Sequence, residues 1–144
     1  MSLRNVFAYT VMVCLFVGIG YGQGKDEFKN YFNDAALRVK AASSPQEKRE
    51  ILSTSLSAMS RSLVAVQRSP LISESDRKAI VRFESSIQEK QNELSGAEGY
   101  TRVPDEHLNA FADYTAQDVE QAEAITISLL ALVLIIILVV LLLR

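Results

Sequence analysis

The stretch SPQEKREILSTSLSAMSRSLVAV, residues 44–66, carries the signals that decide the fold. Ser44 can act as an N-cap, Pro45 fits the first helical position, and Glu47 completes a Ser-x-x-Glu capping box. Serines between residues 52 and 62 alternate with apolar residues, as they would in a strand, but the helical pattern covers more of the chain and has a cap. The stretch therefore predicts an amphipathic helix. Its apolar residues step by four and three as in a heptad: Leu52, Leu56, Met59, Leu63 and Val66.

Three further segments have helical periodicity: about residues 25–42, Ser73 or Ser75 to Ser95, and Pro104 onward. Apolar residues recur in them every three or four positions, which places these residues on one face of each helix. Short connections favour antiparallel neighbours, so we predict an all-α fold, a small antiparallel bundle of three to four helices. The heptad leaves a coiled coil between chains open as an alternative. The apolar positions are Phe28, Tyr31, Phe32, Ala35 and Val39; Ile80, Phe83, Ile87 and Leu94; and Leu108, Phe111, Thr115, Val119 and Ala122.

The C-terminal end is a long uncharged run, because sixteen of the twenty residues at 124–143 are Leu, Ile or Val, and only Arg144 follows. A helix of that length spans about 30 Å, the thickness of the hydrocarbon core of a bilayer. We predict a single transmembrane helix over 124–143 with Arg144 as its cytoplasmic end. No proline or glycine lies between Val119 and Leu143, so one continuous helix from Pro104 is expected. The alternative is a GPI-anchor signal that is removed.

The N-terminus resembles a secretory signal in its layout. Arg4 precedes an uncharged apolar stretch at 6–19, and the small residues Gly20 and Gly22 follow it. We predict a signal peptide at 1–22 and an extracytoplasmic domain at 23–123, with an uncleaved second anchor as the alternative. The domain lacks cysteine and N-glycosylation sequences, which favours a bacterial envelope, with the chain in the inner membrane and its bundle periplasmic.

The composition of residues 23–123 excludes some partners. This region contains all seventeen carboxylates of the chain and every cation except Arg4 and Arg144, so its net charge is −4. Mixed charge of this kind predicts no nucleic-acid partner. The mildly acidic balance also gives no reason to expect attraction to anionic lipid.

Residue types that carry catalysis or bind cofactors are sparse, and we predict no enzyme activity, no cofactor and no metal site. His107 is the only histidine of the chain. A di-iron bundle requires two Glu-x-x-His motifs, and a structural zinc site requires four ligands, usually Cys or His. The carboxylate pairs Glu89/Glu93 and Glu120/Glu123 are interpreted as solvated helix surfaces.

We predict a helix-association face within the transmembrane run, made of Ala124, Ser128 and Ala131, because small residues four apart let helices approach closely. The expected partners are the bilayer and either another protein or a second copy. The functional hypothesis is a membrane-anchored interaction module, an accessory or scaffolding subunit of an envelope assembly. The alternative is a ligand-binding or sensory bundle with a separate output subunit, suggested by Gln91 in an apolar stripe and by the serines of 52–62.

Overall fold

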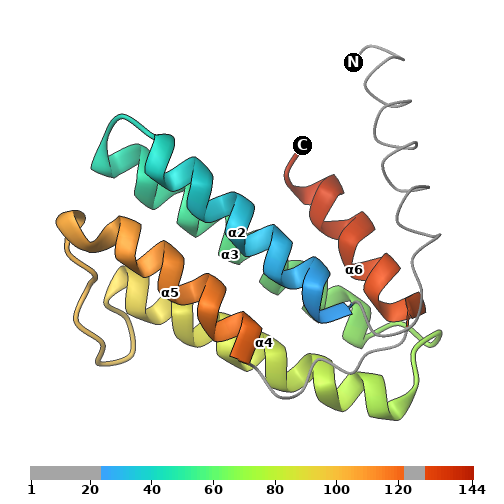
Figure 1. Cartoon of the computed structure of the whole chain (residues 1–144). Helices are drawn as coiled ribbons and strands as arrows, with labels where there is room; N and C mark the ends of the chain where they lie inside the picture. Colours follow the sequence, from blue (N-terminus) through green and yellow to red (C-terminus); the bar gives the residue numbers. More distant parts are fainter. Residues whose placement is uncertain (1–23, 122–128) are drawn as a thin grey trace, which may run out of the picture.

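The computed structural model describes residues 24–121 and 129–144, and these residues form an all-helical structure (Figure 1). The prediction of an all-α fold is confirmed. The predicted signal peptide, 1–22, lies outside the described residues. The elements are α2 (Gly24–Ala41), α3 (Pro45–Gln67), α4 (Glu74–Ser95), the short 3₁₀ helix η1 (Asp105–His107), α5 (Leu108–Gln121) and α6 (Leu129–Leu142).

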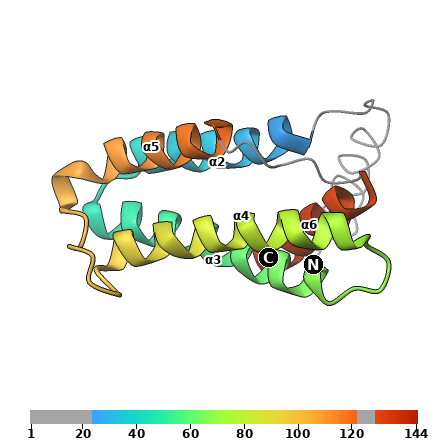
Figure 2. The same cartoon turned by 90° about the horizontal axis from the view of Figure 1, so that it is seen from below.

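Helices α2 to α5 form a bundle of two layers (Figure 2). In one layer α2 packs beside α5, in the other α3 packs beside α4, and α2 also contacts α3. Each of these helices runs antiparallel to the next along the chain, which confirms the predicted antiparallel bundle (Figure 1). Helix α6 packs against α3 as an additional element.

Local hydrogen bonds explain where α3 and α4 begin. The backbone N–H of Glu47 donates to Ser44 Oγ at 3.2 Å, and the Glu47 carboxylate accepts from the N–H of Ser43 at 3.1 Å. The predicted capping bond to Ser44 is therefore present, whereas the Glu47 carboxylate returns to the residue before the cap and not to the cap itself. For α4 the cap is Ser73, whose hydroxyl accepts from the N–H of Asp76 at 3.1 Å.

The core lies between the two layers and is built from the predicted stripes. Every heptad residue of α3 is buried, and none is more than 3% exposed. The alternating serines of 52–62 lie within α3, so the strand alternative is wrong. Phe28 of α2 and Phe83 of α4 join the layers, with ring centroids 4.8 Å apart.

Helix α4 ends at a glycine that cannot easily be replaced. Gly96 has φ of 76°, and its N–H donates to the Asn92 carbonyl at 2.8 Å. A Cβ built on Gly96 would lie 2.9 Å from Arg102 Cβ and 2.9 Å from Arg102 N. This region of backbone conformation is unfavourable for residues with a Cβ, and the approach of Arg102 adds a steric clash.

The substitution Gly96→Ala is therefore expected to lower the free energy of unfolding by about 2–3 kcal/mol. Gly99→Ala is the matched control, since Gly99 also has positive φ, 85°, but a Cβ there would meet nothing within 4 Å. The control should lose only about 1 kcal/mol, the conformational part alone. Urea denaturation of the two variants measures the difference, and equal losses would contradict the clash with Arg102.

The prediction of one continuous helix from Pro104 to Leu143 is wrong. Helix α6 does not continue the axis of α5, and it lies instead against α3 (Figure 1). The physical reason is that α6 can bury one aliphatic side in the core of the bundle, namely Ala131, Ile135 and Val139. Among the residues that the structure describes, no helix is both long and apolar enough to cross a bilayer. The structure describes residues 129–143 of the predicted span, of which α6 comprises 14, and 124–128 lie outside the described ranges.

Candidate interaction surface

Helix α6 provides the candidate surface because it is aliphatic both where it is buried and where it is exposed. Ala131, Ile135 and Val139 are spaced by four residues and are at most 4% exposed. Ile137 is 37% exposed and Leu141 is 53% exposed, and Leu142 and Leu143 are exposed as well. A surface helix normally has a polar outer side, so the exposed aliphatic residues distinguish α6 from an ordinary surface helix and make it the candidate surface.

The structure describes only one of the three predicted helix-association residues. Ala124 and Ser128 lie outside the described ranges. Ala131 is fully buried in the same hydrophobic cluster as the α3 core residues. Its small side chain therefore belongs to the interior of this fold.

A buried lysine that the sequence analysis did not single out connects the two layers. The Lys90 side chain on α4 is 5% exposed, and its Nζ donates to Tyr114 Oη at 2.8 Å and to Glu93 Oε1 at 3.1 Å. It also forms an ion pair with Asp118 Oδ2 at 2.8 Å and lies 4.1 Å from the centroid of the Tyr114 ring. Tyr114 and Asp118 belong to α5, so this Lys90 cluster links α4 to the opposite layer.

The charge of Lys90 is stabilised by the groups around it. Burial alone would lower its pKa, but the hydrogen bonds to Asp118, Tyr114 and Glu93 outweigh that effect and raise the pKa above its ordinary value. Lys90 is therefore cationic at neutral pH. The sequence did contain a signal for this cluster, because Lys90 lies between Ile87 and Leu94 on the otherwise apolar face of α4.

The polar residues that suggested a ligand site bond to one another between α3 and α4. The Gln91 side-chain amide donates to Ser57 Oγ at 3.1 Å, and Ser60 Oγ donates to Glu84 Oε1 at 3.1 Å. No buried side-chain nitrogen or oxygen within the described residues lacks a hydrogen-bond partner. These contacts fix the register of α3 on α4.

The Tyr31 hydroxyl joins α2 to α3 by donating to the Ser55 carbonyl oxygen at 2.8 Å. Burial raises the pKa of Tyr31 to about 12, and the charge of Arg38 opposes part of that rise. Because the folded pKa is raised, this group stabilises the fold fully below pH 10.0, and the stabilisation is lost as the pH rises toward 12.

The Tyr31→Phe variant is expected to lose about 1 kcal/mol of unfolding free energy at neutral pH, because one hydrogen bond is removed. Between pH 10.0 and about 12 the wild-type protein should lose stability more steeply than the variant, which has no phenol at this position. Denaturant titrations across this window measure both slopes. Equal slopes would contradict the assignment of this titration to Tyr31.

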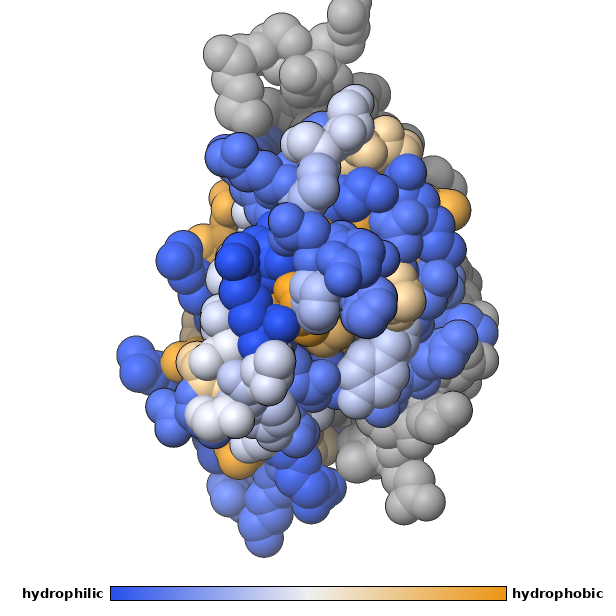
Figure 3. All heavy atoms as spheres, turned by 90° about the vertical axis from the view of Figure 1, so that its left-hand side faces the viewer, coloured by the Kyte–Doolittle hydropathy of each residue, from blue (hydrophilic) through white to orange (hydrophobic). Residues whose placement is uncertain are grey.

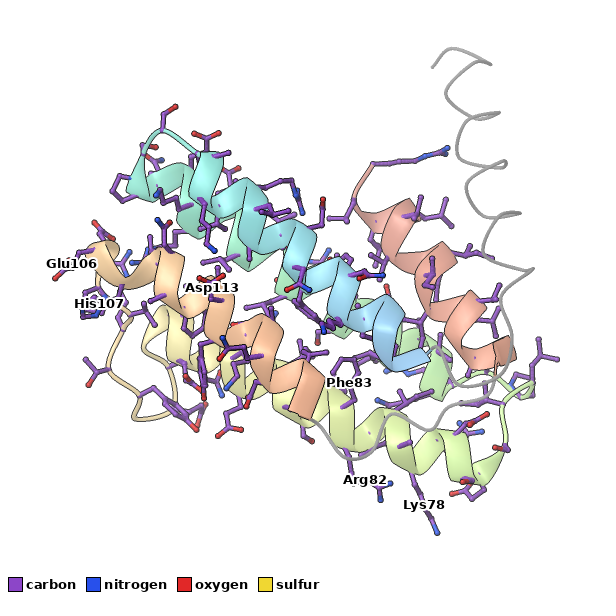
Figure 4. The ribbon with its side chains drawn as sticks, viewed as in Figure 1. Lys78, Arg82, Phe83, Glu106, His107 and Asp113 are labelled. Atoms are coloured by element: carbon purple, nitrogen blue, oxygen red, sulfur yellow. The ribbon has the colours of Figure 1, made fainter. Side chains whose placement is uncertain are left out.

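The remaining candidates for chemistry whose side chains the structure describes lie at the opposite end of the bundle from α6, whereas the pair Glu120/Glu123 lies outside the described side chains. Glu106 and His107 are exposed and project from that end (Figure 4). Glu89 accepts a hydrogen bond from Tyr100 Oη at 2.8 Å, and Glu93 belongs to the Lys90 cluster, so this carboxylate pair has structural partners. No group of three or more His, Cys, Asp or Glu residues in the described ranges could hold a metal ion.

Arg49 organises the loop at this end. Its guanidinium donates to the carbonyls of Leu94 at 3.0 Å and Val103 at 2.7 Å, and to Asp105 Oδ1 at 2.8 Å. It therefore joins α3 to the end of α4 and to the start of η1. The face seen from this end is mostly hydrophilic (Figure 3), in contrast to the exposed aliphatic residues of α6.

Comparison with protein families, with curated proteins and with solved structures found no match to this chain.

Proposed function

We propose that this protein is a membrane-anchored helical interaction module, with its bundle outside the cytoplasm. Residues 124–143 are its anchor, and it acts as an accessory or scaffolding subunit of an envelope protein assembly. The observation that carries the proposal is the aliphatic character of α6 on its exposed side as well as its buried side. Such a helix is stable in lipid or against another apolar surface, and the uncharged run of twenty residues matches the length that a bilayer requires.

We infer that the bundle binds partners through its outer surface, because the polar groups between its helices already bond one another. The polar side chains between its helices bond one another, as the Gln91–Ser57 contact and the Lys90 cluster illustrate. A ligand-binding bundle is the less favoured candidate, because Gln91, its main sequence cue, already has a partner in Ser57. Thermal-shift measurements against metabolite pools would favour it if a small molecule raised the melting temperature.

Anchoring is tested by membrane extraction of the full chain and of Ile137→Arg. The full chain should stay in the membrane fraction after washing at high salt and high pH, and detergent should release it. An arginine near the centre of a spanning helix costs about 2.5–3.5 kcal/mol, so the variant should move largely into the wash. Ile137 is exposed in the bundle, so the same change should not unfold the domain. Ser85→Arg adds the same charge at an exposed site of α4 and is the control.

The interaction role is tested by affinity purification in mild detergent. Co-purification of a defined envelope protein, or of a second copy of the chain, is expected. Recovery of the chain alone as a monomer would contradict the proposed scaffolding role while leaving the anchor untouched.

A further inference from the structure

We propose that one face of the α3–α4 hairpin docks the bundle onto an anionic lipid surface, an inference that rests on the membrane anchoring proposed above. The face contains four exposed cations and two exposed aliphatic residues. We call it the hairpin patch: Arg61, Arg68, Leu71, Lys78, Val81 and Arg82.

The charges of the chain are unevenly distributed along it, and the net charge does not show this. The whole chain has a net charge of −2, but residues 61–82 contain five cations against the carboxylates Glu74 and Asp76. Asp76 is buried, and Glu74 pairs with the fifth cation, Arg77, at 3.4 Å. The four cations of the hairpin patch are exposed, so this face has a positive field in an otherwise acidic domain.

The hairpin brings these residues together. Arg61 lies six residues before the end of α3 and Arg82 eight residues after the start of α4, so both lie within about 12 Å of the connection along the helix axes. Lys78 and Arg82 point away from the other helices (Figure 4).

Exposed aliphatic residues among the cations favour lipid as the occupant. Leu71, in the connection between α3 and α4, is 64% exposed, and Val81 beside Arg82 is 45% exposed. Basic residues attract anionic headgroups, and an aliphatic side chain between them can enter the boundary of the acyl chains. Helix α6 lies at the same end of the bundle as this connection (Figures 1 and 2), so an anchor there would hold the patch near the membrane surface.

The test uses the full chain in vesicles of phosphatidylcholine alone or mixed with phosphatidylglycerol, with brominated lipids as quenchers. The chain contains no tryptophan, so Leu71→Trp introduces a single indole at the tip of the patch. We expect strong quenching of its fluorescence in anionic vesicles, weak quenching in neutral vesicles, and loss of the difference at high salt. Reversal of two patch charges, Lys78→Glu with Arg82→Glu, should weaken this surface association at least about tenfold.

The matched control reverses two cations at the other end of the bundle, Lys48→Glu with Arg102→Glu, and should leave the quenching unchanged. Equal quenching in neutral and anionic vesicles, or none in either, would overturn the docking proposal, as would insensitivity to the patch reversal. Flotation with the vesicles reports the anchor separately. A chain that floats with both lipids and shows no quenching refutes docking alone, whereas a chain that floats with neither refutes the anchor and the docking that depends on it.

Discussion

Replacing Lys90 with alanine is expected to lower the free energy of unfolding by about 2–3 kcal/mol. The lysine is 5% exposed, and its ammonium group holds the contacts of α4 to Tyr114 and Asp118 on α5. Its removal leaves the Glu93 carboxylate, 21% exposed, without its cation. We place the loss below the usual value for a buried pair because Asp118 is 44% exposed and water can solvate it.

Lys90→Met separates the charge from the packing of the side chain. Methionine keeps much of the aliphatic stem but also leaves Glu93 and Asp118 without a cation, so its loss should be only somewhat smaller, about 1–2 kcal/mol. Lys48→Ala is the matched control, since Lys48 also joins two helices, through an exposed contact with Asn109 at 2.8 Å, and should cost less than about 0.5 kcal/mol. Urea denaturation measures all three. A Lys90→Ala loss no larger than that of the control would contradict the role of the Lys90 cluster in joining the layers.

The pH dependence of the Lys90 contribution has a defined sign. The folded pKa is raised, so the contribution is complete below the ordinary value of 10.5 and is lost as the pH rises through the folded pKa. The difference in stability between wild type and Lys90→Met should therefore stay constant from neutral pH to about pH 10 and shrink above it.

The helices of the bundle could be predicted because their signals are local. The N-cap Ser44 is recognised within a few residues and acts as expected, and of the two candidate starts of α4 Ser73 is the cap. The predicted end of α4 at Ser95 is also confirmed, with Gly96 as its C-cap. The heptad of α3 is equally local in sequence, and its residues form the core. Short connections then leave antiparallel neighbours as the simplest arrangement.

Periodicity alone does not identify the partners of a charged residue at a core position, and Lys90 is the example. It follows Ile80, Phe83 and Ile87 at the next stripe position, where the pattern calls for an apolar residue. Its partners Tyr114 and Asp118 lie 24 and 28 residues further along the chain. A lysine at a core position can be interpreted only once the fold shows which carboxylate and phenol it reaches.

The position of α6 could not be predicted, because its sequence is apolar in every direction. In a helix with one polar side the sequence identifies the opposite side as the buried one. Residues 129–143 contain no charged or polar side chain, so no side is identified in this way. Length and hydropathy then suggest a helix that projects from the bundle, and nothing in the pattern identifies the side of α6 that packs against α3.

The packing of α6 against α3 makes two neighbouring positions of α6 differ sharply in their response to charge. Ile135 is fully buried and Ile137 is 37% exposed, although both are isoleucines in the same aliphatic run. An arginine at position 135 would have to enter the hydrophobic cluster without a partner, which costs more than α6 gains by packing. We expect Ile135→Arg to release α6 from the bundle in lipid-free buffer, while Ile137→Arg leaves it in place.

Hydrogen exchange resolves this difference at the level of the helix. In Ile135→Arg the amides of α6 should exchange at least about a hundredfold faster, since the local opening free energy falls by about 3 kcal/mol or more, while amides at the centre of α3 stay protected. In Ile137→Arg the α6 amides should keep their protection. Equal exchange in the two variants would contradict the inward orientation of Ile135. With vesicles present both arginines should oppose insertion, because lipid surrounds a spanning helix on all sides. A difference between the two positions therefore indicates packing of α6 against α3, and an equal effect indicates insertion into the membrane.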